Sequence, residues 1–152
     1  MRDLLVAAAM VLAIAALLVH RPSSRAAIRP SSSLTPGALN PDVTQANIHE
    51  TICVRGWTKT IRPPVEYTNA LKLRQMRVYG LTRSPRDYQE DHLISLELGG
   101  APRDPRNLWP EPYPRAAKVD TIENELNAEV CSGSMSLADA QRRESAMKHA
   151  DG

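Results

Sequence analysis

The segment EDHLISLELGGAPRDPRNLWP, residues 90–110, carries the strongest structural signals in this 152-residue chain. The run YQEDHLISL, residues 88–96, predicts a β-strand with the charged pair Asp91-His92 inside it. Gly99-Gly100 then predicts a loop, and the tetrapeptide that starts at Asn107 predicts a very short second strand ended by a proline. The segment therefore predicts two short strands joined by a glycine-containing loop.

A helix is predicted directly after this pair of strands. Prolines at positions 110, 112 and 114 argue against regular structure before Arg115. The run AAKVDTIENELNAEVC that follows has an apolar stripe at steps of three and four residues: Val119, Ile122, Leu126 and Val130. The order strand, loop, strand, helix should bring Asp91-His92, Asn107 and the first turns of this helix to one place.

Further elements flank these strands. TICV (51–54) and WTKTI (57–61) predict short extended pieces, and TNALKLRQMRVYG (68–80) predicts a helix ended by its glycine. The sequence SLAD at 136–139 resembles a capping box and predicts a terminal helix through about Ala150. Strands and helices that follow one another in this way predict an α+β domain.

The first residues have a different character. Residues 4–19 are an unbroken apolar run, longer than the ~7–15 residues of most signal-peptide cores and shorter than the ~20 of a membrane span. Residues 1–26 are therefore expected to be a cleaved signal peptide or a retained membrane anchor. Residues 27–45 are rich in Pro and Ser, which predicts a flexible linker, and the folded domain is expected at 46–150. The protein should then be secreted or extracytoplasmic, with membrane association through the N-terminal segment where that segment is retained.

Export affects how the two cysteines are interpreted. Cys53 and Cys131 are the only cysteines, and an oxidising compartment favours a bond between them. A bridge would close a loop of 78 residues and would stabilise the fold by roughly 4 kcal/mol in the chain-entropy model. Two free buried thiols are the alternative.

The charge is balanced overall and uneven locally. Without residues 1–26 the chain keeps 16 basic and 16 acidic residues, so it lacks the strong net positive charge of many nucleic-acid-binding domains. Residues 55–86, however, hold eight basic residues against Glu66 alone. This basic half is either a phosphate-binding face, with Arg83 and Arg86 as candidates, or a solvated surface paired with the acidic half.

The Asp91-His92 pair suits phosphodiester hydrolysis, which needs a base to activate water and a cation to stabilise the leaving oxygen. The imidazole of His92 has an unperturbed pKa of ~6.5, suitable for a base near neutral pH. The carboxylate of Asp91 is an oxygen ligand of the kind that Mg²⁺ and Mn²⁺ prefer. A purely structural role of the pair on its strand is the alternative.

The motif D-H-L-I, a Gly-Gly loop and N-L fifteen residues after the histidine, followed by a helix, resembles the HNH family of ββα-metal nucleases. The string DHLISLELGG…NLWPEP is similar to a subgroup of exported bacterial proteins of this type, and the likeness extends from about Thr35 to Gln141. The resemblance implies a small domain with a ββα-metal core and flanking helices. It also implies Asp91 as a metal ligand, His92 as the general base and Asn107 as the residue that braces the loop and orients the base.

The family pattern has a histidine on the helix as a second metal ligand, and this chain has none there. Asn124 or Asp120 is the substitute that the resemblance suggests, and Lys118 is a candidate to bind a phosphate. The expected cofactor is Mg²⁺ or Mn²⁺, with Zn²⁺ as a further option, and no small-molecule cofactor is expected. The expected function is a monomeric, exported, metal-dependent endonuclease that cleaves DNA or RNA. The alternative is a catalytically silent module of the same fold that binds nucleic acid or a protein of the cell envelope.

Overall fold

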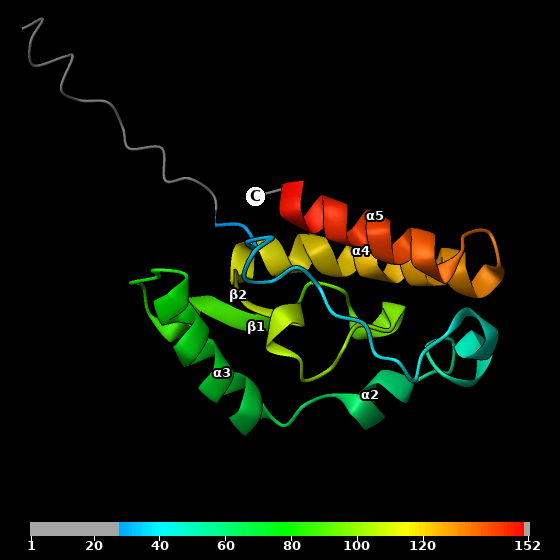
Figure 1. Cartoon of the computed structure of the whole chain (residues 1–152), viewed down its shortest axis with the longest axis horizontal. Helices are drawn as coiled ribbons and strands as arrows, with labels where there is room; N and C mark the ends of the chain where they lie inside the picture. The colour runs from blue at the N-terminus through cyan, green and yellow to red at the C-terminus, as the bar shows by residue number, and fades with distance from the viewer. Residues whose placement is uncertain (1–27, 151–152) are drawn as a thin grey trace, which may run out of the picture.

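The computed structural model describes residues 28–150, so the predicted signal peptide or membrane anchor at 1–26 lies outside the described residues. The described part is an α+β fold in which helices surround a two-stranded antiparallel sheet (Figure 1). The sheet lies between α3 on one side and the paired helices α4 and α5 on the other. The elements are α2 (Trp57–Ile61), α3 (Val65–Val78), β1 (Tyr88–His92), β2 (Leu108–Pro112), α4 (Tyr113–Ser132) and α5 (Leu137–Ala150), with short 3₁₀ helices at Gln45–Glu50, Pro85–Asp87, Leu96–Leu98 and Pro105–Asn107. None of the helices within 28–150 has the length and apolar character needed to cross a membrane.

The two predicted strands form and pair with each other. Their register runs from Tyr88 opposite Pro112 to His92 opposite Leu108. β1 ends at His92, four residues earlier than predicted, because the chain bends after it toward the 3₁₀ helix Leu96–Leu98. The prediction that the prolines exclude regular structure before Arg115 is wrong. Each strand of a two-stranded sheet has one unpaired edge, and a proline, which has no N–H, is tolerated at such an edge.

The loop between the strands closes tightly on itself at its two glycines, as predicted. Gly99 has a φ of +74°, in the left-handed region that suits glycine. At Gly100 an added Cβ would lie 1.8 Å from the main-chain oxygen of Ile94 and 2.7 Å from Nδ2 of Asn107. Only glycine therefore allows the two ends of the loop to approach this closely.

The longer helices form where they were predicted, and the starts of α3 and α4 are shifted. α3 begins at Val65, directly after Pro63-Pro64. α4 begins at Tyr113 and accommodates Pro114 in its first turn, where a missing N–H leaves no hydrogen bond unmade. α5 begins as predicted, with the hydroxyl of Ser136 accepting the N–H of Asp139 at 3.1 Å.

The extended pieces predicted at 51–54 and 57–61 are wrong. TICV forms turns, and WTKTI is helix α2. Apolar alternation over four or five residues does not distinguish a strand from a helical turn, and no described strand lies beside these residues to pair with them.

The predicted flexible linker at 27–45 is also wrong for most of its length. Thr35 is fully buried, and Gly37 N–H donates to the carbonyl of Arg106 at 2.9 Å. Ala101 N–H donates to the carbonyl of Ala38 at 2.8 Å, and Val43 packs in the core. The proline- and serine-rich composition of this segment does not predict its main-chain contacts. The packed part of the chain begins about ten residues before the predicted boundary at 46.

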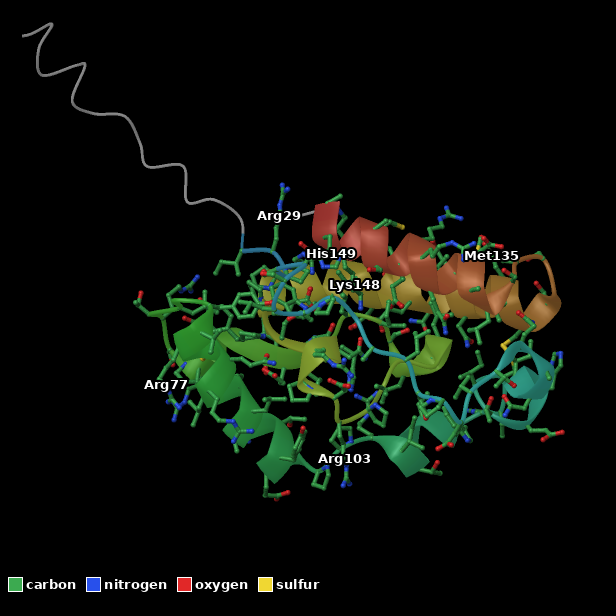
Figure 2. The ribbon with its side chains drawn as sticks, in the orientation of Figure 1. Arg29, Arg77, Arg103, Met135, Lys148 and His149 are labelled. Atoms are coloured by element: carbon green, nitrogen blue, oxygen red, sulfur yellow. A yellow bond between two sulfur atoms is a disulfide. The ribbon has the colours of Figure 1, made fainter. Side chains whose placement is uncertain are left out.

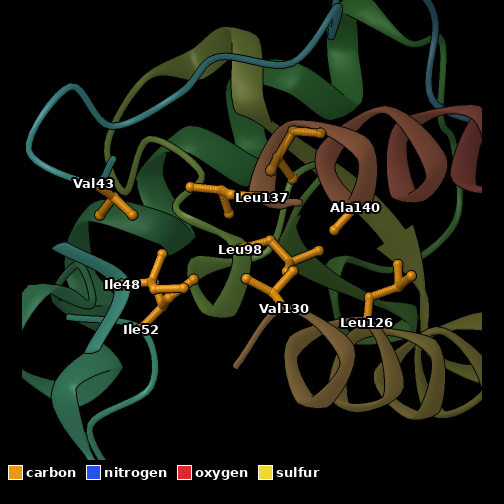
Figure 3. Close-up of a cluster of buried hydrophobic side chains, with 9 residues drawn as sticks. Val43, Ile48, Ile52, Leu98, Leu126, Val130, Leu137 and Ala140 are labelled. Carbon is orange, nitrogen blue, oxygen red and sulfur yellow. The ribbon is translucent and has the colours of Figure 1, made fainter. Parts of the chain in front are cut away.

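The hydrophobic core joins α4, α5, the loop between the strands and the segment before α2 (Figure 3). One cluster of this core contains nine buried residues: Val43, Ile48, Ile52, Ile94, Leu98, Leu126, Val130, Leu137 and Ala140. The predicted disulfide Cys53–Cys131 is present at the edge of this core and connects the segment before α2 to the end of α4.

Candidate active site

A polar cavity of about 380 Å³ lies where the end of β1 meets the first half of α4. Four of the predicted site residues line it together: Asp91, His92, Asp120 and Asn124. Asp91 and His92 are neighbours on a strand and would point to opposite faces of a regular sheet. Both reach the cavity because His92 is the last residue of β1 and the chain bends directly after it.

His92 is held as a neutral base. Its Nε2 lies 3.1 Å from the carbonyl oxygen of Pro102, and because a carbonyl can only accept, Nε2 carries the proton. Burial lowers the pKa of His92 below its ordinary value, against the opposing effect of Asp91. The neutral ring then has its lone pair on Nδ1, for which the described residues provide no hydrogen bond. The side chain of His92, which is 6% exposed and lines the cavity, therefore offers Nδ1 as a proton acceptor.

Asn107 is fully buried and braces the loop behind His92. Its Oδ1 accepts the N–H of Ile94 at 2.9 Å. Its Nδ2 donates to the carbonyls of Ile94 at 2.9 Å and of Ala101 at 3.1 Å. These bonds fix the chain on both sides of the Gly-Gly turn, and thereby the Pro102 carbonyl that orients the imidazole.

Behind Asp91 lies a cluster of charges centred on Lys148 of α5, which is 2% exposed. Its Nζ donates to Oε1 of Glu123 at 2.5 Å and to the carbonyl of His92 at 2.6 Å. Oε1 of Glu144 lies at 3.2 Å and Oδ2 of Asp91 at 3.6 Å. Burial alone would lower the pKa of Lys148, but the carboxylates of Glu144, Asp91 and Glu123 outweigh it and raise that pKa. The ammonium form of Lys148 is therefore favoured, and the side chain lies against Glu123 of α4 (Figure 2).

A second ion pair continues the cluster along β2. Glu111 is fully buried and is paired with Arg115, four residues later in the first turn of α4, and burial raises the pKa of Glu111 to about 8. Arg115 also donates to the carbonyl of Lys148 at 2.5 Å and lies 5.2 Å from the centre of the Trp109 ring. Trp109 is fully buried and belongs to the core.

The wall of the cavity is strongly acidic. Glu90, Glu97 and Glu123 line it in addition to Asp91 and Asp120, and the cationic side chain among its lining residues is Arg62. Burial raises the pKa of Glu90 and of Glu123 to about 8, with nearby lysines opposing the shift. Glu123 has the ammonium of Lys148 as its counter-ion, whereas burial disfavours the ionised form of Glu90 at this wall.

The donors at the wall fit a hard divalent cation. Within residues 28–150 no three His, Cys, Asp or Glu side chains are arranged as a metal cage. Mg²⁺ commonly binds proteins through one or two carboxylates, water and substrate phosphates. Asp91, Asp120 and Asn124 supply such oxygens, and Oδ2 of Asp91 has the Lys148 ammonium at 3.6 Å as its charged neighbour but no hydrogen bond among the described residues.

The predicted nucleic-acid-binding residues do not line the cavity. Lys118 is exposed on α4 and lines a separate apolar pocket together with Met147. Arg83 is ion-paired with Asp87 at 3.0 Å, and Arg86 lies in a shallow groove near the start of β1. Arg62, at the end of α2, is the basic residue that reaches the cavity, and the sequence placed it only within a basic half.

The sequence reasoning also missed Glu144 and Lys148. The signal for them is in α5, where the buried positions follow steps of three and four residues: Leu137, Ala140, Glu144 and Lys148. An ion pair that continues an apolar stripe is expected to point inward. Two oppositely charged residues one turn apart are usually a surface pair, so the sequence alone does not single out Glu144 and Lys148.

Comparison with known proteins gives no match. No family model matches the chain, no curated protein matches it, and no solved structure matches it.

Proposed function

We propose that the protein is an exported, divalent-cation-dependent phosphodiesterase of the HNH-like ββα-metal type that cleaves nucleic acid, with His92 as its general base. The observation that carries the proposal is the hydrogen bond from Nε2 of His92 to the Pro102 carbonyl. It leaves Nδ1 as the acceptor on a neutral ring that lines a cavity with Asp91. The consecutive elements β1, β2 and α4 support the finer fold assignment, and the disulfide supports an extracytoplasmic location.

The roles of the chain's own residues follow from their positions. Nδ1 of His92 accepts a proton from water as the water oxygen attacks phosphorus, and the leaving oxygen departs with the electrons of its bond to phosphorus. Arg62 at the cavity wall attracts the phosphodiester. Asn107 keeps the loop that orients the base. A bound Mg²⁺ or Mn²⁺ would be held by Asp91 with Asp120 or Asn124 and would supply stabilisation of the negative charge that develops.

A plasmid-nicking assay with the purified protein tests the proposal. We expect nicking in Mg²⁺ or Mn²⁺ that stops with EDTA, and a rate roughly 10²–10⁴-fold lower for His92→Ala. His49→Ala is the matched control because His49 is exposed and does not line the cavity, and its rate should equal that of the unmodified protein. Equal rates for His92→Ala and the control would rule out His92 as the base.

One observation favours a second candidate, a catalytically silent module of the same fold. The Lys148 ammonium already neutralises part of the carboxylate cluster, and an acidic wall without a cation repels phosphate. Calorimetric titration with Mg²⁺ and Mn²⁺ distinguishes the two, because the silent module should bind neither ion and the phosphodiesterase should bind at least one.

A further inference from the structure

Lys148 occupies the point at which carboxylates from three elements converge. Asp91 comes from β1, Glu123 from α4 and Glu144 from α5 itself, and all three oxygens lie within 3.6 Å of Nζ. The main-chain carbonyl of His92 supplies a fourth oxygen at 2.6 Å. Four oxygens around one buried positive charge form the type of environment that otherwise surrounds a bound cation.

The residues around Lys148 hold its ammonium group in a fixed position. Glu144 is fully buried; its two carboxylate oxygens share the N–H of Ser95 at 3.1 and 3.0 Å, and its Oε1 lies 3.2 Å from Nζ of Lys148, so it is held by both groups. Lys148 lies one helical turn after Glu144 on the inward face of α5, and its own carbonyl accepts a hydrogen bond from Arg115. The ammonium is therefore held in place by α4, α5 and the end of β1 together.

Two of the carboxylates belong to both environments. Asp91 and Glu123 contact Lys148 and also line the cavity in which we place the external cation. An ammonium and a divalent cation that share these oxygens repel each other over a few ångströms in a partly buried site. The two positive charges therefore compete for the same donors.

We propose that Lys148 is an internal cation that takes the inner half of the carboxylate site, so that an external divalent cation binds only the outer oxygens and binds weakly. The inference rests on the proposed function for the place of the external cation. It adds that a residue of the C-terminal helix sets the affinity for that cation. Lys148 is in this sense a positioning residue and not a catalytic one.

Mn²⁺ binding to the purified full chain, measured by electron paramagnetic resonance, tests this without any activity assay. The main variant is Glu144→Gln/Lys148→Met, which removes one charge of each sign and leaves Asp91 and Glu123 free. Replacing both members of a buried ion pair with neutral side chains of similar size is often tolerated. Lys118→Met is the matched control, because it removes an exposed lysine of α4 that does not line the cavity.

We expect the double variant to bind Mn²⁺ roughly tenfold or more tightly than the unmodified protein, and Lys118→Met to match the unmodified protein. A folded double variant, verified by circular dichroism, with unchanged or weaker Mn²⁺ affinity overturns the inference. If the double variant binds Mn²⁺ more tightly but the unmodified protein does not nick plasmid DNA, the internal-cation proposal is supported and the proposed function is contradicted. The two proposals can therefore fail separately.

A measurement on the unmodified protein covers the case in which the double variant does not fold. ¹⁵N-detected NMR of lysine side chains should show one slowly exchanging ammonium, that of Lys148, in EDTA. We expect its signal to keep its position and slow exchange when millimolar Mg²⁺ is added. Loss of that signal on adding Mg²⁺ would mean that the external ion displaces the ammonium and would overturn the inference.

Discussion

At the scale of single residues, Asn107 shows how one side chain can determine the shape of the site. It makes three hydrogen bonds to the main chain of Ile94 and Ala101, all within a loop that Gly100 allows to close. The sequence gives the residue type and its spacing from His92. The family resemblance implied the bracing role, and the hydrogen bonds are those that such a role requires.

Asn107→Asp tests this bracing. Aspartate keeps the acceptor for the N–H of Ile94 but loses both donated hydrogen bonds and places a carboxylate beside two carbonyl oxygens. Two buried carbonyls without donors should lower the free energy of unfolding by at least about 2 kcal/mol. Urea denaturation followed by circular dichroism measures the change, and an unchanged midpoint would show that the loop does not depend on these bonds.

Glu90 should give the protein a pH-dependent stability. Both of its carboxylate oxygens are buried without hydrogen-bond partners among the described residues, and burial raises its pKa from 4.5 to about 8. A group whose folded-state pKa is raised contributes stability that is fully present below pH 4.5 and is lost as the pH rises through about 8. Glu90→Gln removes this loss.

Thermal unfolding in EDTA at pH 5 and pH 9 measures the effect of Glu90→Gln. We expect the variant to melt higher than the unmodified protein at pH 9, by about 2–4 °C or more, and the difference to shrink at pH 5. A difference of the same size at both pH values would mean that the Glu90 carboxyl group is not responsible.

Among single residues, the sequence predicted those site residues whose role depends on near neighbours in the chain. Asp91 and His92 were predicted from residue type and position, and Asn124 from the family resemblance; all three line one cavity. Lys148 was not chosen, because its partners are more than twenty residues away along the chain except for Glu144. Only the packing of α5 against α4 and β1 brings such charges together.

At the scale of elements, helices were easier to predict than strands. Periodicity over sixteen residues identified α4, whereas five residues of alternation wrongly suggested a strand where α2 lies. The prolines of β2 and of the first turn of α4 shifted predicted boundaries, because their effect depends on which edge or turn they occupy. The packing of residues 35–43 depends on main-chain partners more than fifty residues away, which composition does not encode.

The start of α5 offers a test of an element boundary, since Ser136 caps it and α5 carries Lys148. Ser136→Ala should lower the free energy of unfolding by about 0.5–2 kcal/mol because the N–H of Asp139 loses its acceptor. Urea denaturation provides the measurement, with Ser32→Ala, an exposed serine outside any helix, as the control. Equal midpoints for the two variants would show that the cap does not stabilise α5.

At the scale of the whole molecule, one disulfide joins parts of the chain that are 78 residues apart. The apolar cluster beside it contains only nine buried residues, so a restriction on the unfolded chain adds appreciably to the stability of the fold. Cys53→Ser/Cys131→Ser should lose about 4 kcal/mol of stability, and reductant should destabilise the unmodified protein similarly while leaving the variant unaffected. If reductant leaves the urea midpoint of the unmodified protein unchanged, the expected contribution of the bridge is contradicted.

The central claim for the whole molecule is that the imidazole of His92 accepts a proton during phosphodiester cleavage. Chemical rescue of His92→Gly tests it most directly, because the variant leaves a space that free imidazole can enter. We predict that plasmid nicking by the variant in Mn²⁺ falls roughly 10²–10⁴-fold and recovers in part as imidazole is added, with no such effect on the unmodified protein. A His92→Gly variant that is folded and cleaves at the full rate without imidazole would contradict the claim.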